Sequence, residues 1–155
     1  MILYRIARER YARDLSGNGG LVSSARWHDH LPVIYTAFNS STCILETLVH
    51  LMPEEIHNDL QLITIDAADK VASEMITPAQ LPPGWKEIPG PPFLKQLGNA
   101  WLRGNTAALL IVPSAVDPLA QNVLINPLHP DISHISVKAI LPFTYDQRLL
   151  TFKRR

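Results

Sequence analysis

Three residues of contrasting chemistry, Arg26, Tyr35 and Glu46, lie within 21 consecutive positions. An arginine can grip a diphosphate through two parallel N–H donors, and a tyrosine ring can stack on a flat base. A carboxylate beside a ribose can accept a hydroxyl hydrogen bond and stabilise an oxocarbenium-like transition state. Together the three suit cleavage of the N-glycosidic bond of a nucleotide. The same residue types are also ordinary as a surface arginine, a core aromatic residue and a solvated carboxylate.

Other residues with reactive groups match no established pattern. His28-Asp29-His30 carries two imidazoles, but the spacing fits no common metal motif, so no metal is expected. Cys43 stands near the start of a predicted helix without a nucleophile signature around it. Ser114 is not part of a G-x-S-x-G elbow, and Gly17-Asn-Gly-Gly20 matches neither phosphate-binding fingerprint. We expect solvated or structural histidines, a buried cysteine and a flexible glycine loop.

A loop, a strand and a helix must position the first three residues. Arg26 lies in a loop, and the β-branched and aromatic residues 33–38, set off by Pro32, predict a strand that carries Tyr35. Residues 42–52 predict a helix that ends at Pro53. The predicted N-cap is one of Asn39, Ser40 or Ser41, and the predicted apolar stripe is Ile44, Leu45, Leu48, Val49 and Met52. Glu46 lies off that stripe.

The remainder of the chain predicts a mixed set of elements. Strands are expected at residues 2–7, 60–65, 107–112, 135–141 and 149–152, and a helix at 93–103. The chain has 13 prolines, about 8% against a typical ~5%, and six of them fall between Thr77 and Phe93. That stretch is expected to be a surface connection pinned by Trp85. The predicted fold class is α+β, with a mixed, mainly antiparallel sheet and short flanking helices, as a single domain over residues 1–155.

Composition excludes several classes of protein. Fourteen basic residues balance 14 acidic ones in 155 residues, which argues against a general nucleic-acid binder and a charge-anchored membrane protein. The single cysteine allows no internal disulfide. The first residues lack the apolar stretch of a signal peptide, and the longest apolar run, residues 107–112, is far below the ~20 residues of a membrane span. We therefore expect a cytoplasmic protein.

Short segments along nearly the whole chain resemble one known family, the RES-domain toxins of bacterial Xre–RES toxin–antitoxin pairs. The order and spacing of these segments carry the resemblance. They are Leu3-Tyr-Arg-Ile6, Leu15-Ser-Gly-Asn-Gly-Gly-Leu21, Ala25-Arg-Trp27, Pro32-Val-Ile-Tyr-Thr-Ala37, Leu45-Glu-Thr-Leu-Val-His50, Leu81-Pro-Pro-Gly-Trp85, Leu97-Gly-Asn-Ala-Trp101, Val112-Pro-Ser-Ala115, Asn122-Val-Leu-Ile-Asn-Pro-Leu-His-Pro130 and Asp146-Gln-Arg148.

The resemblance implies a fold like that of ADP-ribosyltransferase toxins and NAD as the substrate. The arginine, glutamate and serine that name the family fall on Arg26, Glu46 and Ser114, and a further functional tyrosine falls on Tyr35. The implied activity cleaves the nicotinamide–ribose bond and depletes NAD by phosphorolysis or hydrolysis, with inorganic phosphate as a candidate co-substrate and no tightly bound cofactor. The implied partners are a second copy of the toxin and an Xre-type helix-turn-helix antitoxin that occludes the active site.

The resemblance also implies a role for each residue. Arg26 would bind the NAD diphosphate with Arg5 as a helper, Tyr35 would pack on the nicotinamide or its ribose, and Glu46 would hold the ribose hydroxyl. Ser114 would offer its hydroxyl to the same ribose or to the carboxamide. This sequence departs from the usual family pattern before and after Arg26: Ser23-Ser24-Ala25 replace glycines, His28 replaces a frequent asparagine, and 29–31 lack a glycine.

Three other functions remain open at this point. Transfer of ADP-ribose to a protein involves the same bond cleavage with a different acceptor. A non-catalytic protein-binding module could use the proline-rich stretch as its docking surface. A nucleic-acid-cleaving toxin is the weakest of the three, because no basic stripe interleaved with aromatic residues is present. The basic end, Lys153-Arg154-Arg155, is expected to be a solvated tail.

Overall fold

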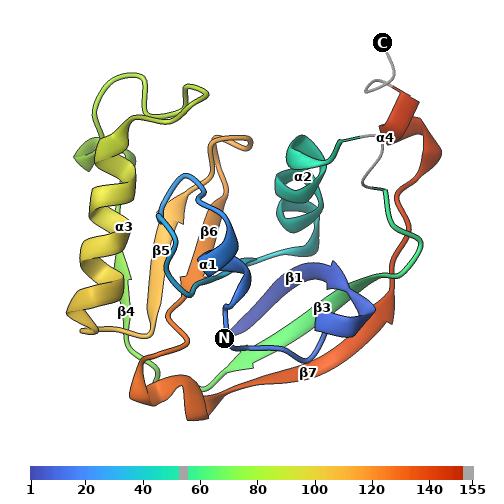
Figure 1. Ribbon diagram of the computed structural model, residues 1–155, viewed down its shortest axis with the longest axis horizontal. Coiled ribbons are helices and arrows are strands. Elements are labelled where there is room, and N and C mark those ends of the chain that lie inside the picture. The colour runs from blue at the N-terminus through green and yellow to red at the C-terminus, as the bar shows by residue number, and fades with distance from the viewer. Residues whose placement is uncertain (53–55, 152–155) are drawn as a thin grey trace.

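A bent, mainly antiparallel sheet forms the framework of the computed structural model, which describes residues 1–52 and 56–151. Its strand order is β4-β5-β6-β2-β1-β3-β7 (Figure 1). Only β4 and β5 are paired in parallel among the described strands. The strands are β1 (Ile2–Arg8), β2 (Ile34–Ala37), β3 (Leu60–Ala67), β4 (Ser73–Met75), β5 (Leu109–Pro113), β6 (Gln121–Ile125) and β7 (Ile135–Pro142).

Short helices flank this sheet, as the predicted fold class requires. They are α1 (Gly19–Val22), α2 (Ser40–His50), α3 (Pro92–Gly104) and α4 (Gln147–Thr151). Short 3-10 helices lie at Glu9–Tyr11, Pro78–Gln80 and Pro130–His134. Within the described parts of the chain, no helix is long and apolar enough to cross a membrane.

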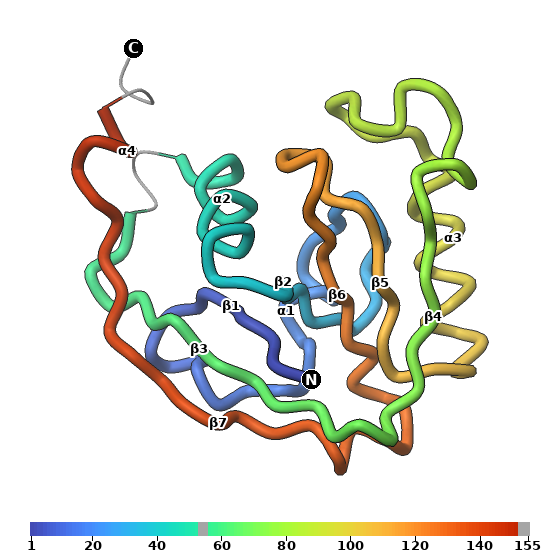
Figure 2. The backbone as a smooth tube through the Cα atoms, turned by 180° about the vertical axis from the view of Figure 1, so that it is seen from behind, coloured from blue at the N-terminus to red at the C-terminus, as the bar shows by residue number. Residues whose placement is uncertain are grey.

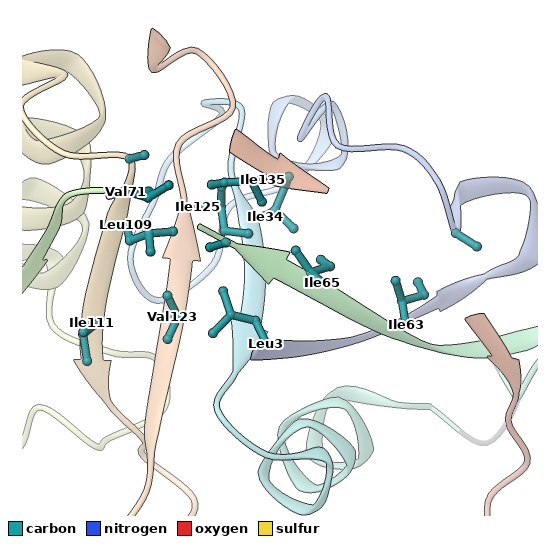
Figure 3. Packing of buried hydrophobic residues seen from close by; sticks show 13 residues of the cluster. Leu3, Ile34, Ile63, Ile65, Val71, Leu109, Ile111, Val123, Ile125 and Ile135 are labelled. Carbon is teal, nitrogen blue, oxygen red and sulfur yellow. The ribbon is translucent and has the colours of Figure 1, made fainter. Parts of the chain in front are cut away.

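Strand β5 is buried on both faces, which explains its continuous apolar sequence. Leu109 and Ile111 point into one core cluster together with Leu3 and Ile65 (Figure 3). Leu110 and Val112 alternate with them and join a second cluster around Trp101 of α3. Because successive side chains of a strand point to opposite faces, a run without polar residues is expected where both faces are covered. The predicted strand is thereby confirmed, although it spans Leu109–Pro113 rather than 107–112.

Helix α2 presents a different face to the protein than its apolar pattern predicts. Asn39 caps it, since its side-chain oxygen accepts a hydrogen bond from the Thr42 backbone N–H at 2.7 Å. Leu45, Val49 and Met52 are 38%, 48% and 59% exposed, although the predicted stripe placed them inside. The prediction was wrong for Leu45 and Val49 because the inward face of α2 borders a cavity and is therefore partly polar. The helix ends at His50, two residues before Met52, the last residue of the predicted helix, so Met52 lies beyond it. Pro53 lies outside the described residues.

The late part of the chain holds two further differences from the expected elements. Residues 147–151 form α4 rather than the strand predicted at 149–152, and Phe152 and the basic tail lie outside the described residues. Leu150 of α4 is buried against Tyr145 and Leu60, in a small cluster to which Leu48 of α2 also belongs. Strands β4 and β6 were not predicted, and α1 occupies part of the predicted glycine loop.

The proline-rich stretch is a long connection between β4 and α3. Figures 1 and 2 show it at the same end of the molecule as the turn between β5 and β6. Trp85 packs at the edge of the cluster around Trp27 and Trp101, as the predicted anchor should. Helix α3 approaches Trp27 so closely that a Cβ built on Gly98 would overlap the Trp27 carbonyl oxygen. The prolines are thus part of the frame that holds the segment 25–28.

Candidate active site

A cavity of about 520 Å³ opens where β1, β2, α2 and the segment 23–28 meet. This volume is typical of small-ligand sites. Arg5, Arg26, Tyr35 and Glu46 all line it. The structure therefore brings together four of the five residues predicted for the site. The fifth, Ser114, is 1% exposed and lies behind the wall that its neighbours Pro113 and Ala115 form.

Two side chains hold one oxygen of the Glu46 carboxylate. Ser114 Oγ and Asn122 Nδ2 each donate a hydrogen bond to Oε1, both at 2.6 Å. Charge-assisted hydrogen bonds of this length are stronger than neutral ones. No described residue donates a hydrogen bond to the other oxygen, Oε2. The carboxylate is therefore fixed through Oε1 and keeps Oε2 available as an acceptor in the cavity.

The surroundings of Ser114 fix the direction of its hydroxyl. Its Oγ accepts backbone N–H hydrogen bonds from Val116 at 3.1 Å and Asp117 at 3.0 Å. Because Oγ already accepts two hydrogen bonds, the hydroxyl donates its own hydrogen to Glu46. Ser114 therefore acts on Glu46 in this geometry, whereas the sequence analysis expected its hydroxyl to reach the ribose or carboxamide directly.

Arg26 is held by the backbone of the proline-rich connection. Its Nη1 donates to the carbonyls of Trp85 and Glu87, and its Nη2 donates to the carbonyl of Lys86 at 3.4 Å. Among the described residues, these bonds leave Nε–H unused and engage only one of the two Nη2 hydrogens, and Nε and Nη2 together form the edge with which an arginine grips anions bidentately. Burial lowers the pKa of Arg26, against the opposing effect of Glu46 and Tyr35, but a guanidinium stays charged.

Arg5 is the second cation of the cavity and comes from β1. Its Nη1 donates to the backbone carbonyl of Asp14 at 2.8 Å. Burial lowers the pKa of Arg5, while the charge of Asp14 raises it. A largely buried cation that lines a cavity is a strong attractant for an anion, because little water screens it.

Tyr35 and His28 form a hydrogen-bonded pair beside Arg26. His28 Nδ1 lies 2.9 Å from Tyr35 Oη, and the backbone N–H of Trp27 donates to the same oxygen at 3.3 Å. His28 Nε2 lies 2.9 Å from the carbonyl oxygen of Ser23. Burial raises the pKa of Tyr35 and lowers that of His28, so both side chains are neutral at pH 7. Tyr35 thus contributes a ring and an engaged hydroxyl to the cavity.

The remaining candidates fall into place around this site. Cys43 is buried, and burial raises the pKa of its thiol to about 11, so the nucleophilic thiolate is scarce at pH 7. His28 is a buried structural histidine, whereas His30 is exposed and contacts Asp29 and Ser24. Within the described ranges, no three histidine, cysteine or acidic side chains gather as a metal site would require.

Sequence reasoning missed the functional position of two residues. Asn122 was present in a quoted motif without a role, and nothing in the linear pattern pairs it with a glutamate 76 positions earlier. For His28, the sequence indicates a weak metal candidate and a replacement of the asparagine that is frequent in the family, but no contact with Tyr35. The motif Ala25-Arg-Trp27, which ends directly before His28, could have pointed to a residue that supports the site.

Comparisons with known proteins agree on one family. The family model described as RES domain matches residues 2–146. A protein named Toxin Res from Pseudomonas putida is 42% identical over 96% of this chain and 99% of its own length. A protein named Prs ADP-ribosylating toxin, from a Sphingobium strain, is 35% identical over 93% of this chain and 91% of its own.

A solved structure shares the fold at low sequence identity. It is the crystal structure of the M. tuberculosis MbcT-MbcA toxin-antitoxin complex, with a TM-score of 0.75 and 18% identity. The match covers 99% of this chain and 89% of the other. At that identity the likeness establishes architecture, which confirms the predicted α+β fold. The model match and the identities to the Res toxins together establish that this chain belongs to the RES domain family.

Proposed function

We propose that this protein is a toxin that consumes NAD by cleaving its nicotinamide–ribose bond. The observation that carries this proposal is the Glu46 carboxylate, held through one oxygen and presenting the other to a cavity that Arg5, Arg26 and Tyr35 share. A dinucleotide needs a site for a diphosphate, a flat surface for an aromatic ring and an acceptor for a ribose hydroxyl. These residues can supply all three.

The proposed reaction divides the work among the same groups. Arg26 binds the diphosphate through the edge formed by Nε and Nη2, and Arg5 adds a second positive charge. Tyr35 packs against the nicotinamide or its ribose. Glu46 Oε2 accepts a hydrogen bond from a ribose hydroxyl and stabilises positive charge on the sugar while nicotinamide departs with the bonding electron pair. An oxygen of phosphate or water then bonds to the ribose carbon that nicotinamide has left, and an attacking water releases one proton to solvent.

Transfer of ADP-ribose to a protein is the second candidate acceptor chemistry. It is supported by the name of the Sphingobium relative, an ADP-ribosylating toxin. Bond cleavage would proceed at the same residues, and a protein side chain would replace phosphate or water. Hydrolysis and phosphorolysis leave no label on protein, so the acceptors can be told apart by following labelled ADP-ribose.

The proposed partners follow the family. A DNA-binding antitoxin of the Xre type would neutralise this toxin in the cytoplasm by covering the cavity, and the toxin would form a homodimer. The structural neighbour supports an antitoxin, since it is a toxin–antitoxin complex. A helix-turn-helix protein encoded next to this gene, which rescues growth on co-expression, is the expected finding.

Nicotinamide release from NAD tests the central proposal. Wild-type protein is compared with Glu46→Gln, Arg26→Ala and the matched surface variant Glu9→Gln, each with and without phosphate. We expect release by wild type and Glu9→Gln, and a loss of about a hundredfold or more in Glu46→Gln. A phosphate requirement would select phosphorolysis, and label retained on protein would select transfer. Absence of release by folded wild type under all conditions would refute NAD cleavage.

A further inference from the structure

His28 does more in this structure than fill space next to the cavity. Its side chain is 3% exposed and bridges two parts of the site, the backbone at Ser23 and the hydroxyl of Tyr35. The rings of His28 and Tyr35 lie 5.5 Å apart at an interplanar angle of 55°. A buried imidazole with both nitrogens engaged has a fixed orientation, and it fixes the groups that it contacts.

The hydrogen-bond partners determine which nitrogen carries the proton. The Ser23 oxygen is a carbonyl and can only accept, so His28 Nε2 carries the hydrogen and donates. Burial lowers the pKa of His28 and keeps the ring neutral, so Nδ1 has a lone pair. Nδ1 therefore accepts a hydrogen bond from the Tyr35 hydroxyl, and the two atoms lie 2.9 Å apart. The Tyr35 oxygen in turn accepts the backbone N–H of Trp27.

We propose that His28 is a positioning residue that acts through Tyr35, by holding its hydroxyl so that the ring keeps one orientation in the cavity. This inference rests on the proposed NAD cleavage for its functional meaning. The Tyr35 proton is already committed to His28, so the contribution of Tyr35 to a substrate is the ring surface rather than a donated hydrogen bond. A ring that could rotate or tilt would present that surface less well to a flat substrate.

Two substitutions separate the two contacts of His28. In His28→Asn, the side-chain oxygen can take the place of Nδ1 and keep the Tyr35 contact, but the Ser23 contact is lost. In His28→Gln, the terminal amide can reach the place of Nε2 and keep the Ser23 contact, but the Tyr35 contact is lost. Each variant is made with Tyr35 and with Tyr35→Phe, and kcat and KM for nicotinamide release are measured.

The positioning role predicts an asymmetric result. We expect His28→Asn to retain kcat within about threefold and His28→Gln to lose about tenfold or more, because only the second breaks the bond to Tyr35. In the Tyr35→Phe background the two variants should be equal. Three results would each overturn the inference: equal losses in the Tyr35 background, a larger loss in His28→Asn, or a difference between the two variants that persists in the Tyr35→Phe background.

Two measurements on the free protein keep this inference separate from the proposed activity. Nitrogen NMR of the His28 ring should show the tautomer protonated at Nε2, and Nδ1 protonation would contradict the inference. Thermal unfolding of His28→Gln, Tyr35→Phe and the double variant should show that the two losses in Tm are not additive. Additive losses would overturn the coupling, and an inactive wild type with intact coupling would refute the proposed function alone.

Discussion

Glu46 depends on two residues that come from distant parts of the chain, and both contacts go to the same oxygen. Ser114 Oγ and Asn122 Nδ2 each lie 2.6 Å from Oε1. A carboxylate fixed in this way needs little rearrangement when charge develops on a bound sugar. Loss of either donor would let the carboxylate rotate and would leave part of its charge without a partner.

Removing Asn122 is expected to reduce the reaction rate more than stability. A hydrogen bond to a charged group contributes ~1.5–3 kcal/mol, so Asn122→Ala should lower kcat for nicotinamide release by about ten- to a hundredfold. Gln121→Ala, at the adjacent position of β6, is the control and should retain activity. A wild-type rate in Asn122→Ala would show that Glu46 needs no support from β6.

Arg26 combines a structural contact with a candidate ligand contact, and Lys can replace neither fully. Arg26→Lys keeps the positive charge but loses the planar set of donors that reaches the carbonyls of 85–87 and also carries the edge formed by Nε and Nη2. We expect KM for NAD to rise about tenfold or more. The exposed Arg148→Lys serves as the control and should keep wild-type KM. An unchanged KM in Arg26→Lys would mean that charge alone is sufficient.

At the scale of elements, α3 is held against the segment 25–28 by a position that tolerates no side chain. The Cβ of an alanine at position 98 would overlap the Trp27 carbonyl oxygen, far inside van der Waals contact. Gly98→Ala should therefore push α3 away from Trp27 and destabilise the fold by about 2 kcal/mol or more. Thermal unfolding measures this loss, and activity should fall with it because Arg26 and His28 flank Trp27.

Gly104→Ala on the same helix is the matched control. A Cβ there would meet nothing within 4 Å, and alanine favours helix over glycine. We expect an unchanged or slightly higher Tm. Equal destabilisation by both substitutions would indicate that glycine at position 98 matters for the helix backbone rather than for its contact with Trp27.

Local sequence patterns predicted the elements whose burial or capping can be recognised from a few consecutive residues. The continuous apolar run at 109–112 marks a strand covered on both faces, and the helix start near Asn39 follows from capping chemistry. The helix face at Leu45 and Val49 was mispredicted because apolar periodicity assumes that the inner side of a helix packs on a core. Here the inner side of α2 borders the cavity and carries Glu46, Thr47 and His50.

The residues that form the site were partly predictable from the sequence, but the hydrogen bonds between them were not. Arg26, Tyr35 and Glu46 stand close in sequence within one loop–strand–helix unit, so their convergence needs few assumptions. Asn122 reaches Glu46 only because β6 pairs with β2, a pairing that depends on register across the sheet. Strand β6 escaped prediction because it is short and begins with Gln121 and Asn122, which carry no strand signal of their own.

At the scale of the whole molecule, stability should depend on pH through His28. Burial lowers its pKa below the value in the unfolded chain, with the nearby charges of Lys95 lowering and Asp29 raising it. Between these two values the unfolded chain binds more protons than the folded one. The stability that the fold gains by keeping His28 neutral is therefore fully present above pH ~6.5, the usual histidine pKa, and is lost as pH falls below that value.

Thermal unfolding of wild type at pH 7.5, 6.5 and 5.5 should show a falling Tm at the acidic end. In His28→Asn the fall over this range should be smaller, because the substituted side chain does not titrate. Gln121→Ala, which removes no titratable group, should fall as wild type does. The same slope in wild type and His28→Asn would assign the pH dependence to other groups.

The long separation between Glu46 and its partners has a consequence for synthesis of the protein. Ser114 and Asn122 follow Glu46 by 68 and 76 positions. At ~5–20 residues per second, a ribosome adds the last of these partners roughly 4–15 s after the glutamate. A nascent chain that has emerged only as far as α3 holds Arg26, Tyr35 and Glu46 without the donors that fix the carboxylate. The complete site therefore forms late in translation, only after β6 has been synthesised and paired with β2.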